Sequence, residues 1–71
     1  MRTYPLKSSN ISDVGYDDAT QSLEVGFKNG SRYHYTKVPK ALFEAMLKAP
    51  SPGRYFHQVV KVGGYPFVRI N

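Results

Sequence analysis

Few side chains in this sequence are suited to proton transfer or nucleophilic attack. The two histidines, His34 and His57, fall in different predicted elements. Asp17 and Asp18 lie in a stretch with the composition of a turn, where acidic residues are common because they hydrogen-bond the backbone. Ser51 would need a base and an oxyanion hole, which no spacing implies. The sequence has no cysteine, no P-loop, no H-E-x-x-H and no G-x-S-x-G, so we expect a protein that is not an enzyme and has no cofactor or metal site.

The distribution of charge points instead to binding of a polyanion. The net charge is +5 at pH 7. Four of the five acidic residues lie within residues 1–24, whereas eight of the ten Lys and Arg lie beyond them. A basic surface attracts anionic partners, of which nucleic acid is the commonest. The basic residues of the second part of the chain are therefore candidate contacts.

Three basic side chains fall on one side of a predicted helix, residues 52–61. Arg54, His57 and Lys61 are spaced i, i+3 and i+7, and Gln58 lies among them. In an α-helix this spacing places all four on one face, and no acidic residue interrupts it. The helix therefore predicts a surface that can bind a phosphate backbone.

The start of the same helix has the features of a phosphate site. Ser51-Pro52 predicts an N-cap followed by proline at the first helical position. Backbone N–H groups at a helix start attract anions, Gly53 permits a close approach, and Arg54 supplies a guanidinium. We expect Ser51, Gly53 and Arg54 to hold a phosphate group.

Two tyrosines of a predicted hairpin, Tyr33 and Tyr35, serve either packing or binding, depending on its register. Asn29-Gly30 between alternating strands is a strong hairpin signal because both residues tolerate positive φ. A two-residue loop would place both rings opposite the apolar side chains of strand 23–27, as an exposed platform. A three-residue loop, residues 28–30 with a bulge at the glycine, would place them on the same face as those side chains. Both loops accept the sequence, and burial of large rings favours the second.

In the favoured register, the opposite face of the hairpin is polar and mildly basic. It carries Arg32 and His34, with Lys28 at the tip, and Gly26 leaves it unobstructed. Because a nucleic-acid strand can lie on such a face, these three basic side chains join the candidate contacts.

Hydrophobic periodicity predicts the strands. One is expected over 11–16, with a bulge near Ser12-Asp13, and one over 23–27. The hairpin turn leads to a third strand. Residues 65–70 read as an extended segment, and Pro66 suits an edge strand or a docked tail.

Two helices follow the third strand. The first is expected to open at Pro39 and to end before Pro50, and the second to span 52–61 with Gly63-Gly64 as its stop. Each has an apolar stripe that predicts a buried face: Leu42, Phe43, Met46 and Leu47 on the first, and Tyr55, Phe56, Val59 and Val60 on the second.

These elements predict an α+β fold of order β-β-β-α-α with an extended C-terminal segment. An antiparallel sheet of three or four strands should be covered on one face by the two helices. The chain is expected to form a single domain, residues 1–71, with residues 1–7 as a flexible or extended tail. We expect a cytoplasmic location and no membrane partner, because no apolar run has the length of a signal peptide or of a span.

Nearly the whole sequence resembles the KTSC domain family. That family is named for its occurrence at the C-terminus of some lysyl-tRNA synthetases, and it includes many stand-alone bacterial and phage proteins of this length. The resemblance implies RNA binding through this fusion context, although the family has no established activity. The sequence departs from the family pattern in its stiff Pro50 and Pro52, and in His57, where asparagine is frequent. The motifs that carry the resemblance are Ser8-Ser9-Asn10-Ile11, Val14-Gly15-Tyr16-Asp17, Leu23-Glu24-Val25 through Phe27, Asn29-Gly30, Tyr33-His34-Tyr35, Val38-Pro39, Ala49-Pro50-Ser51-Pro52-Gly53, Tyr55-Phe56 and Tyr65-Pro66-Phe67.

The sequence thus predicts a non-catalytic module that binds RNA or single-stranded DNA. The alternative is a protein-interaction adaptor that uses the final strand edge or the tail 65–68 for β-augmentation. The expected nucleic-acid contacts are Arg54, His57, Lys61, Arg32, His34 and Lys28, with the phosphate at Ser51, Gly53 and Arg54, and with Tyr33 and Tyr35 as the motif aromatics.

Overall fold

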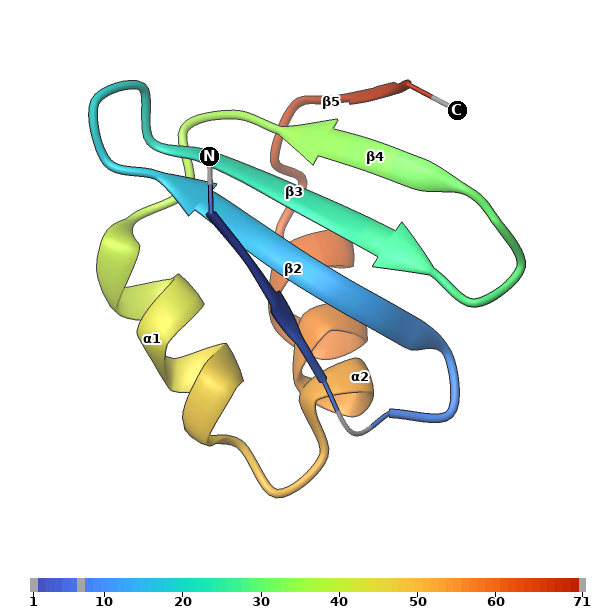
Figure 1. Cartoon of the computed structure of the whole chain (residues 1–71). Helices are drawn as coiled ribbons and strands as arrows, with labels where there is room; N and C mark the ends of the chain where they lie inside the picture. Colours follow the sequence, from blue (N-terminus) through green and yellow to red (C-terminus); the bar gives the residue numbers. More distant parts are fainter. Residues whose placement is uncertain (1, 7, 71) are drawn as a thin grey trace.

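The computed structural model describes residues 2–6 and 8–70, which form one antiparallel sheet and two helical segments (Figure 1). Over these residues the sheet has five strands in the order β1-β2-β3-β4-β5, so each strand pairs with the next along the chain. The elements are β1 (Arg2–Pro5), β2 (Ile11–Asp17), β3 (Ser22–Phe27), β4 (Arg32–Tyr35), α1 (Lys40–Lys48), α2 (Pro52–Tyr55), the π-helical segment η1 (Phe56–Lys61) and β5 (Phe67–Arg69).

The α+β class is confirmed, but the expected count of three or four strands is too low. The additional strand is β1, which lies in the segment predicted as a tail. It pairs with β2 from Arg2 opposite Tyr16 to Pro5 opposite Asp13. Its sequence lacks an alternating apolar pattern, so only its pairing with β2 makes it a strand.

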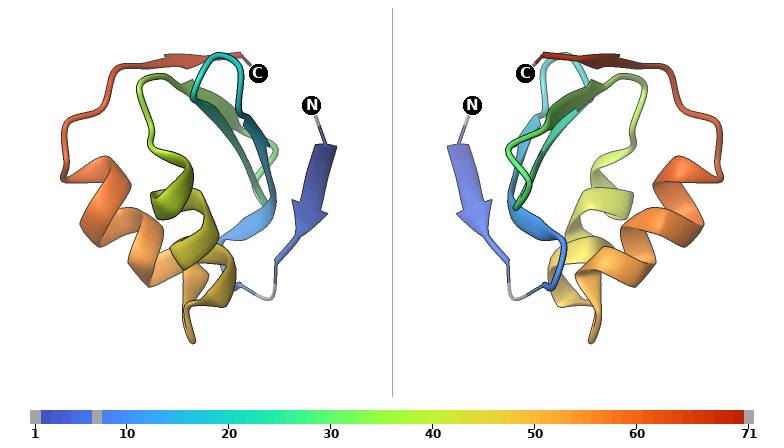
Figure 2. Two further views of the ribbon diagram at one scale, coloured as in Figure 1. Left: turned by 90° about the vertical axis from the view of Figure 1, so that its left-hand side faces the viewer. Right: turned by 90° about the vertical axis from the view of Figure 1, so that its right-hand side faces the viewer.

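The molecule has two layers, because both helical segments cover the same face of the sheet (Figure 2). We call this covered face the inner face and the other the outer face. The apolar stripes predicted for the helices do turn inward. The buried core consists of Ile11, Val14, Leu23, Val25, Tyr35, Val38, Leu42, Phe43, Met46, Phe56 and Val60.

The hairpin has the predicted three-residue loop. Leu23 lies opposite Tyr35, and Val25 lies opposite Tyr33. The backbone N–H of Phe27 donates to the carbonyl of Ser31 at 2.8 Å. Residue 30 has the positive φ of a glycine bulge, +95°. Both tyrosines therefore lie on the inner face.

The second helix covers the predicted residues, but it is not a regular α-helix throughout. From Phe56 to Lys61 it widens into a π-helix, and at its end the N–H of Val62 donates to the carbonyl of His57, five residues earlier. In a π-helix, residues five apart stack on one side, whereas in an α-helix with 3.6 residues per turn they lie about 140° apart. Phe56 and Lys61 therefore share a side.

The C-terminal segment forms an edge strand, as Pro66 suggested. β5 pairs with β4, with Phe67 opposite Tyr35 and Val68 opposite His34. The carbonyl of Pro66 accepts a hydrogen bond from the N–H of Thr36 at 2.9 Å. Directly opposed residues share a face of a sheet, so Phe67 points to the inner face and Val68 to the outer face.

Candidate ligand-binding groove

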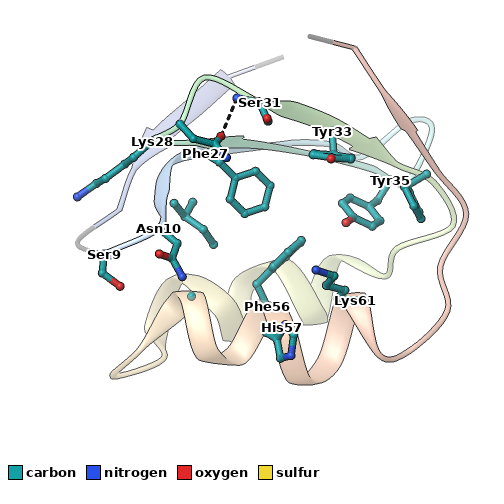
Figure 3. Close-up of a pocket in the computed structure, with 14 residues that line it drawn as sticks. Ser9, Asn10, Phe27, Lys28, Ser31, Tyr33, Tyr35, Phe56, His57 and Lys61 are labelled. Carbon is teal, nitrogen blue, oxygen red and sulfur yellow. Dashed lines mark hydrogen bonds between the residues drawn. The ribbon is translucent and has the colours of Figure 1, made fainter.

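An open groove of about 740 Å³ lies between the inner face of the hairpin and the segment α2–η1 (Figure 3). Phe56 projects from the helix toward the sheet, and Tyr33 is seen edge-on, lying along the sheet. Polar and basic side chains lie around this aromatic lining, among them Asn10, Lys28 and Lys61. The aromatic rings that line the groove are Phe27, Tyr33, Tyr35, Phe56 and Phe67.

These five rings touch one another and form a continuous wall. The ring centroid of Tyr35 is 5.5 Å from that of Phe56 and 5.3 Å from that of Phe67. Tyr33 is 5.8 Å from both Phe27 and Phe67. Tyr35 and Phe56 are buried, whereas the side chain of Phe67 is 58% exposed. The wall thus has a buried base and an exposed end at β5.

The two motif tyrosines, which the sequence assigned either to packing or to binding, lie in different environments. Tyr35 belongs to the buried core, and its burial raises the pKa of its hydroxyl above the usual value. Tyr33 is only half-buried and lies along the groove. The two tyrosines share a face, but Tyr35 mainly holds the fold together while Tyr33 also presents its ring to the groove.

The basic side chains of the second helix border two neighbouring hollows. Arg54, His57 and Lys61 are all exposed, as predicted. Arg54 borders a neighbouring hollow of about 540 Å³, Lys61 borders the aromatic groove, and His57 borders both. In Figure 3 Lys61 lies beside Phe56 and points into the groove, while His57 projects away from the wall. The two hollows adjoin, since both are lined by Ser9, Asn10, Gly53 and His57. That the three basic side chains share one side of the helix stays a prediction.

The three residues of the predicted phosphate site at the helix start, Ser51, Gly53 and Arg54, all line the second hollow. Ser51 takes the N-cap position, but its side chain makes no capping hydrogen bond. A Cβ on Gly53 would come within 2.7 Å of the Oγ of Ser8. That Oγ also accepts hydrogen bonds from the N–H groups of Asn10 and Ile11, each at 3.2 Å. The close approach that Gly53 permits is therefore a contact with the segment before β2.

The outer face of the hairpin is not the open basic surface that the sequence suggested. Arg32 donates two hydrogen bonds to Asp13, at 3.1 and 2.8 Å, and two to Glu24, at 3.1 and 2.8 Å. These bonds lower the pKa of the Asp13 carboxyl and raise that of the Arg32 guanidinium. A Cβ on Gly26 would lie 2.3 Å from an Nη of Arg32. Gly26 is thus covered, and the charge of Arg32 is balanced within the domain.

The remaining predicted contacts, Lys28 and His34, lie apart from each other. Lys28 is exposed at the hairpin tip and extends away from the aromatic rings (Figure 3). His34 is half-buried on the outer face, between Glu24 of β3 and Val68 of β5. Of the two, only Lys28 borders the groove.

Sequence reasoning missed Phe27 and Phe67 as lining residues of a site. The periodicity of strand 23–27 predicts a buried face for Phe27 and contains no sign of a groove. Phe67 reaches Tyr33 only because β5 returns to pair with β4. Such a distant pairing leaves no local signal in the sequence.

Within residues 2–6 and 8–70, no three His, Cys, Asp or Glu side chains gather in a way that could hold a metal ion. In the same ranges no helix has the length and apolar character needed to cross a membrane.

The fold and site together define a class: a small two-layer α+β domain with an aromatic groove between sheet and second helix. The chain belongs to the KTSC domain family, whose model matches residues 7–65. A KTSC domain protein from Yersinia pestis has a similar crystal structure, with a TM-score of 0.89 and 34% identity. That similarity covers 99% of this chain and 97% of the other.

Relatives occur both as proteins of this size and as parts of larger ones. An uncharacterized protein of Stutzerimonas stutzeri is 42% identical over 71 residues, which is the full length of both chains. A lysine–tRNA ligase of Trichormus variabilis is also 42% identical over 61 residues, covering 82% of this chain. The matching part is 11% of that ligase. The family is therefore present in bacteria both by itself and within much longer chains.

Proposed function

We propose that this domain is a non-catalytic module that binds RNA or single-stranded DNA through its aromatic groove. The observation that carries this proposal is the groove itself, with five aromatic rings along it and Lys61 and Lys28 at its border. Proteins that bind single strands combine aromatic platforms, on which bases stack, with basic side chains that follow the backbone. The groove supplies both on one surface.

The charge of the rest of the surface supports the same proposal. The net charge is +5, and Arg54 and Lys61 are exposed on the helical segment without a described ion pair. Arg32 is left out of the interface because Asp13 and Glu24 already bind it. The proposed backbone contacts are therefore Lys61, Lys28 and, across the second hollow, Arg54 with His57.

The relatives give this proposal a context. A lysine–tRNA ligase acts on an RNA, and part of such a ligase matches this chain. An RNA-binding module would have an evident use next to that activity. We infer an RNA-directed role for this chain from the groove, and the relative makes RNA the first ligand to test.

The test is a titration of labelled single-stranded RNA and DNA pools, followed by fluorescence anisotropy at increasing salt concentration. We expect binding at low salt, with a slope of log affinity against log salt of about −0.7 for each phosphate neutralised on a single strand. No change in anisotropy with any pool at low salt would contradict the proposal.

A second candidate function, a protein-interaction adaptor, is favoured by the exposed apolar side chains of the C-terminal strand. Phe67, Val68 and Ile70 are 58%, 64% and 49% exposed. In the described sheet β5 is an edge strand, and such an edge can accept a strand from a partner protein. An NMR titration with peptide pools that shifts residues 67–70, with no RNA-dependent shifts in the groove, would favour the adaptor.

A further inference from the structure

Phe67 forms the exposed end of the aromatic wall. Phe67 contacts both Tyr33 and Tyr35, yet more than half of its side chain remains open to solvent. Its place opposite Tyr35 in the β4–β5 pair directs it to the inner face. The groove therefore contains an aromatic surface that the core does not cover.

The groove has the dimensions of a site for a small planar group. Its volume of about 740 Å³ falls within the range of about 300–1,000 Å³ that is usual for small-molecule sites. A double helix presents only base edges and its backbone, so it could not place a ring face against Phe67. An unpaired base can turn out of its strand and enter.

A positive charge lies beside the aromatic wall of the groove. Lys61 lies beside Phe56 and points into the groove (Figure 3). This position follows from the π-helical turns between the two residues. At the opposite end of the groove, Lys28 and Asn10 add a second charge and an amide.

We propose that the groove takes one unpaired base of a single strand, stacked on Phe67 and Tyr33, with an adjoining phosphate at Lys61. The inference rests on the proposed function, because it names the part of the nucleic acid that enters the groove. It goes further in requiring a base, whereas electrostatic binding requires only phosphates.

The decisive experiment uses two DNA strands of equal length and charge. One is fully abasic, and the other is abasic except for a single central adenine. Because their phosphates are the same, any difference in affinity comes from the base. We expect the adenine strand to bind about five- to one-hundred-fold more tightly, the range observed for stacking of one base on a protein ring.

Two neighbouring variants supply the matched comparison. Phe67→Leu keeps an apolar side chain over Tyr35 but removes the ring, and Val68→Ala alters an equally exposed residue on the outer face. Phe67→Leu should remove most of the advantage of the adenine strand and leave the affinity for the abasic strand unchanged. Val68→Ala should leave both affinities unchanged, and an unchanged circular dichroism spectrum shows that each variant is folded.

The remaining outcomes separate this inference from the proposed function. Equal affinity of the wild-type protein for both strands would overturn the base site and leave nucleic-acid binding intact. If Val68→Ala removed the advantage as fully as Phe67→Leu, the groove would not be the site. Displacement of the adenine strand by adenosine monophosphate at a similar concentration would overturn the assignment to a strand. Failure to bind either strand or any RNA pool would instead refute the proposed function.

Discussion

The two faces of the sheet differ in whether contacts within the domain already satisfy their side chains. On the outer face, Arg32 binds both Asp13 and Glu24 and covers Gly26, so charge and space are satisfied within the domain. On the inner face, the Tyr35 end of the aromatic wall is buried, whereas Phe67 at the other end is largely exposed to solvent. The number of cations on a strand therefore does not locate a polyanion site, because the domain itself can neutralise them. What matters is which groups the fold leaves without a partner.

The largest expected effect tests whether the inner face is a core as well as a groove. Tyr35→Ala removes a buried ring that contacts Phe56 and Phe67. We expect the free energy of unfolding to fall by about 3 kcal/mol or more, as for truncation of other large aromatic core residues. Urea denaturation followed by circular dichroism measures this change.

The matched control for that experiment is Tyr35→Phe, which keeps the ring and removes only the hydroxyl. It should cost much less than Tyr35→Ala, because ring burial supplies most of the stabilisation. Tyr33→Ala should also cost less, since Tyr33 is only half-buried. If Tyr33→Ala were as destabilising as Tyr35→Ala, the division between a core ring and a groove ring would be wrong.

The next effect concerns Lys61, whose positive charge borders the groove. Lys61→Glu should weaken RNA binding severalfold for all sequences alike, because phosphate contacts carry no base information. It should also reduce the magnitude of the salt slope by about 0.7 for the lost contact on a single strand. The same anisotropy titration measures both quantities.

Lys48→Glu is the matched charge reversal. Lys48 is also exposed and ends a helix, but it lies on α1 and does not border the groove. We expect its variant to retain most of the affinity. Equal losses from the two reversals would mean that RNA responds to net charge, and that Lys61 has no special place.

A smaller effect tests the outer face. Arg32→Met should destabilise the fold by about 1 kcal/mol, because it leaves two partly buried carboxylates close together without their cation. RNA affinity should hardly change, since the charge of Arg32 is already balanced. Lys40→Met provides the comparison, because the ion pair of Lys40 with Asp18 is more exposed and its loss should matter less. A large loss of RNA binding in Arg32→Met would show that the outer face is part of the RNA interface.

The sequence predicted the parts of this arrangement that depend on neighbouring residues. The glycine bulge at residue 30 and the hairpin register follow from turn chemistry and ring burial, and both are present. The helix stripes and the stop near Gly64 follow from local periodicity and from the freedom of glycine. These features therefore needed no knowledge of the tertiary structure.

The parts that failed depend on contacts between distant segments. β1 exists only as a partner of β2, and Ser8 fills the space beside Gly53. The balance of Arg32 by Asp13 joins residues of β2 and β4. The π-helical turns, which move Lys61 toward the groove, have no recognisable pattern in the sequence. The same limit hid Phe67, and with it the open end of the candidate site.

The smallest effect is the pH dependence of the outer-face ion pair. Hydrogen bonds from Arg32 hold the pKa of Asp13 in the folded protein below its usual value near 3.8. A carboxyl whose pKa is lowered by folding stabilises the fold fully above its unfolded pKa, and this contribution disappears as the pH falls through the folded pKa. The stabilisation should therefore be complete at neutral pH and lost in acid. We expect the change to be below about 1 kcal/mol, because the pair is partly exposed.

A double-mutant cycle isolates this contribution from every other titrating group. The free energies of unfolding of the wild type, Arg32→Met, Asp13→Asn and the double variant give the coupling between the two side chains. The coupling should be favourable at pH 6 and smaller at pH 2, because pH 2 lies below the unfolded pKa of Asp13 and the contribution decreases as the pH falls toward the lowered folded pKa. A coupling of the same size at both pH values would show that the contact acts by packing over Gly26. In that case packing, and not charge balance, would distinguish the outer face from the aromatic inner face.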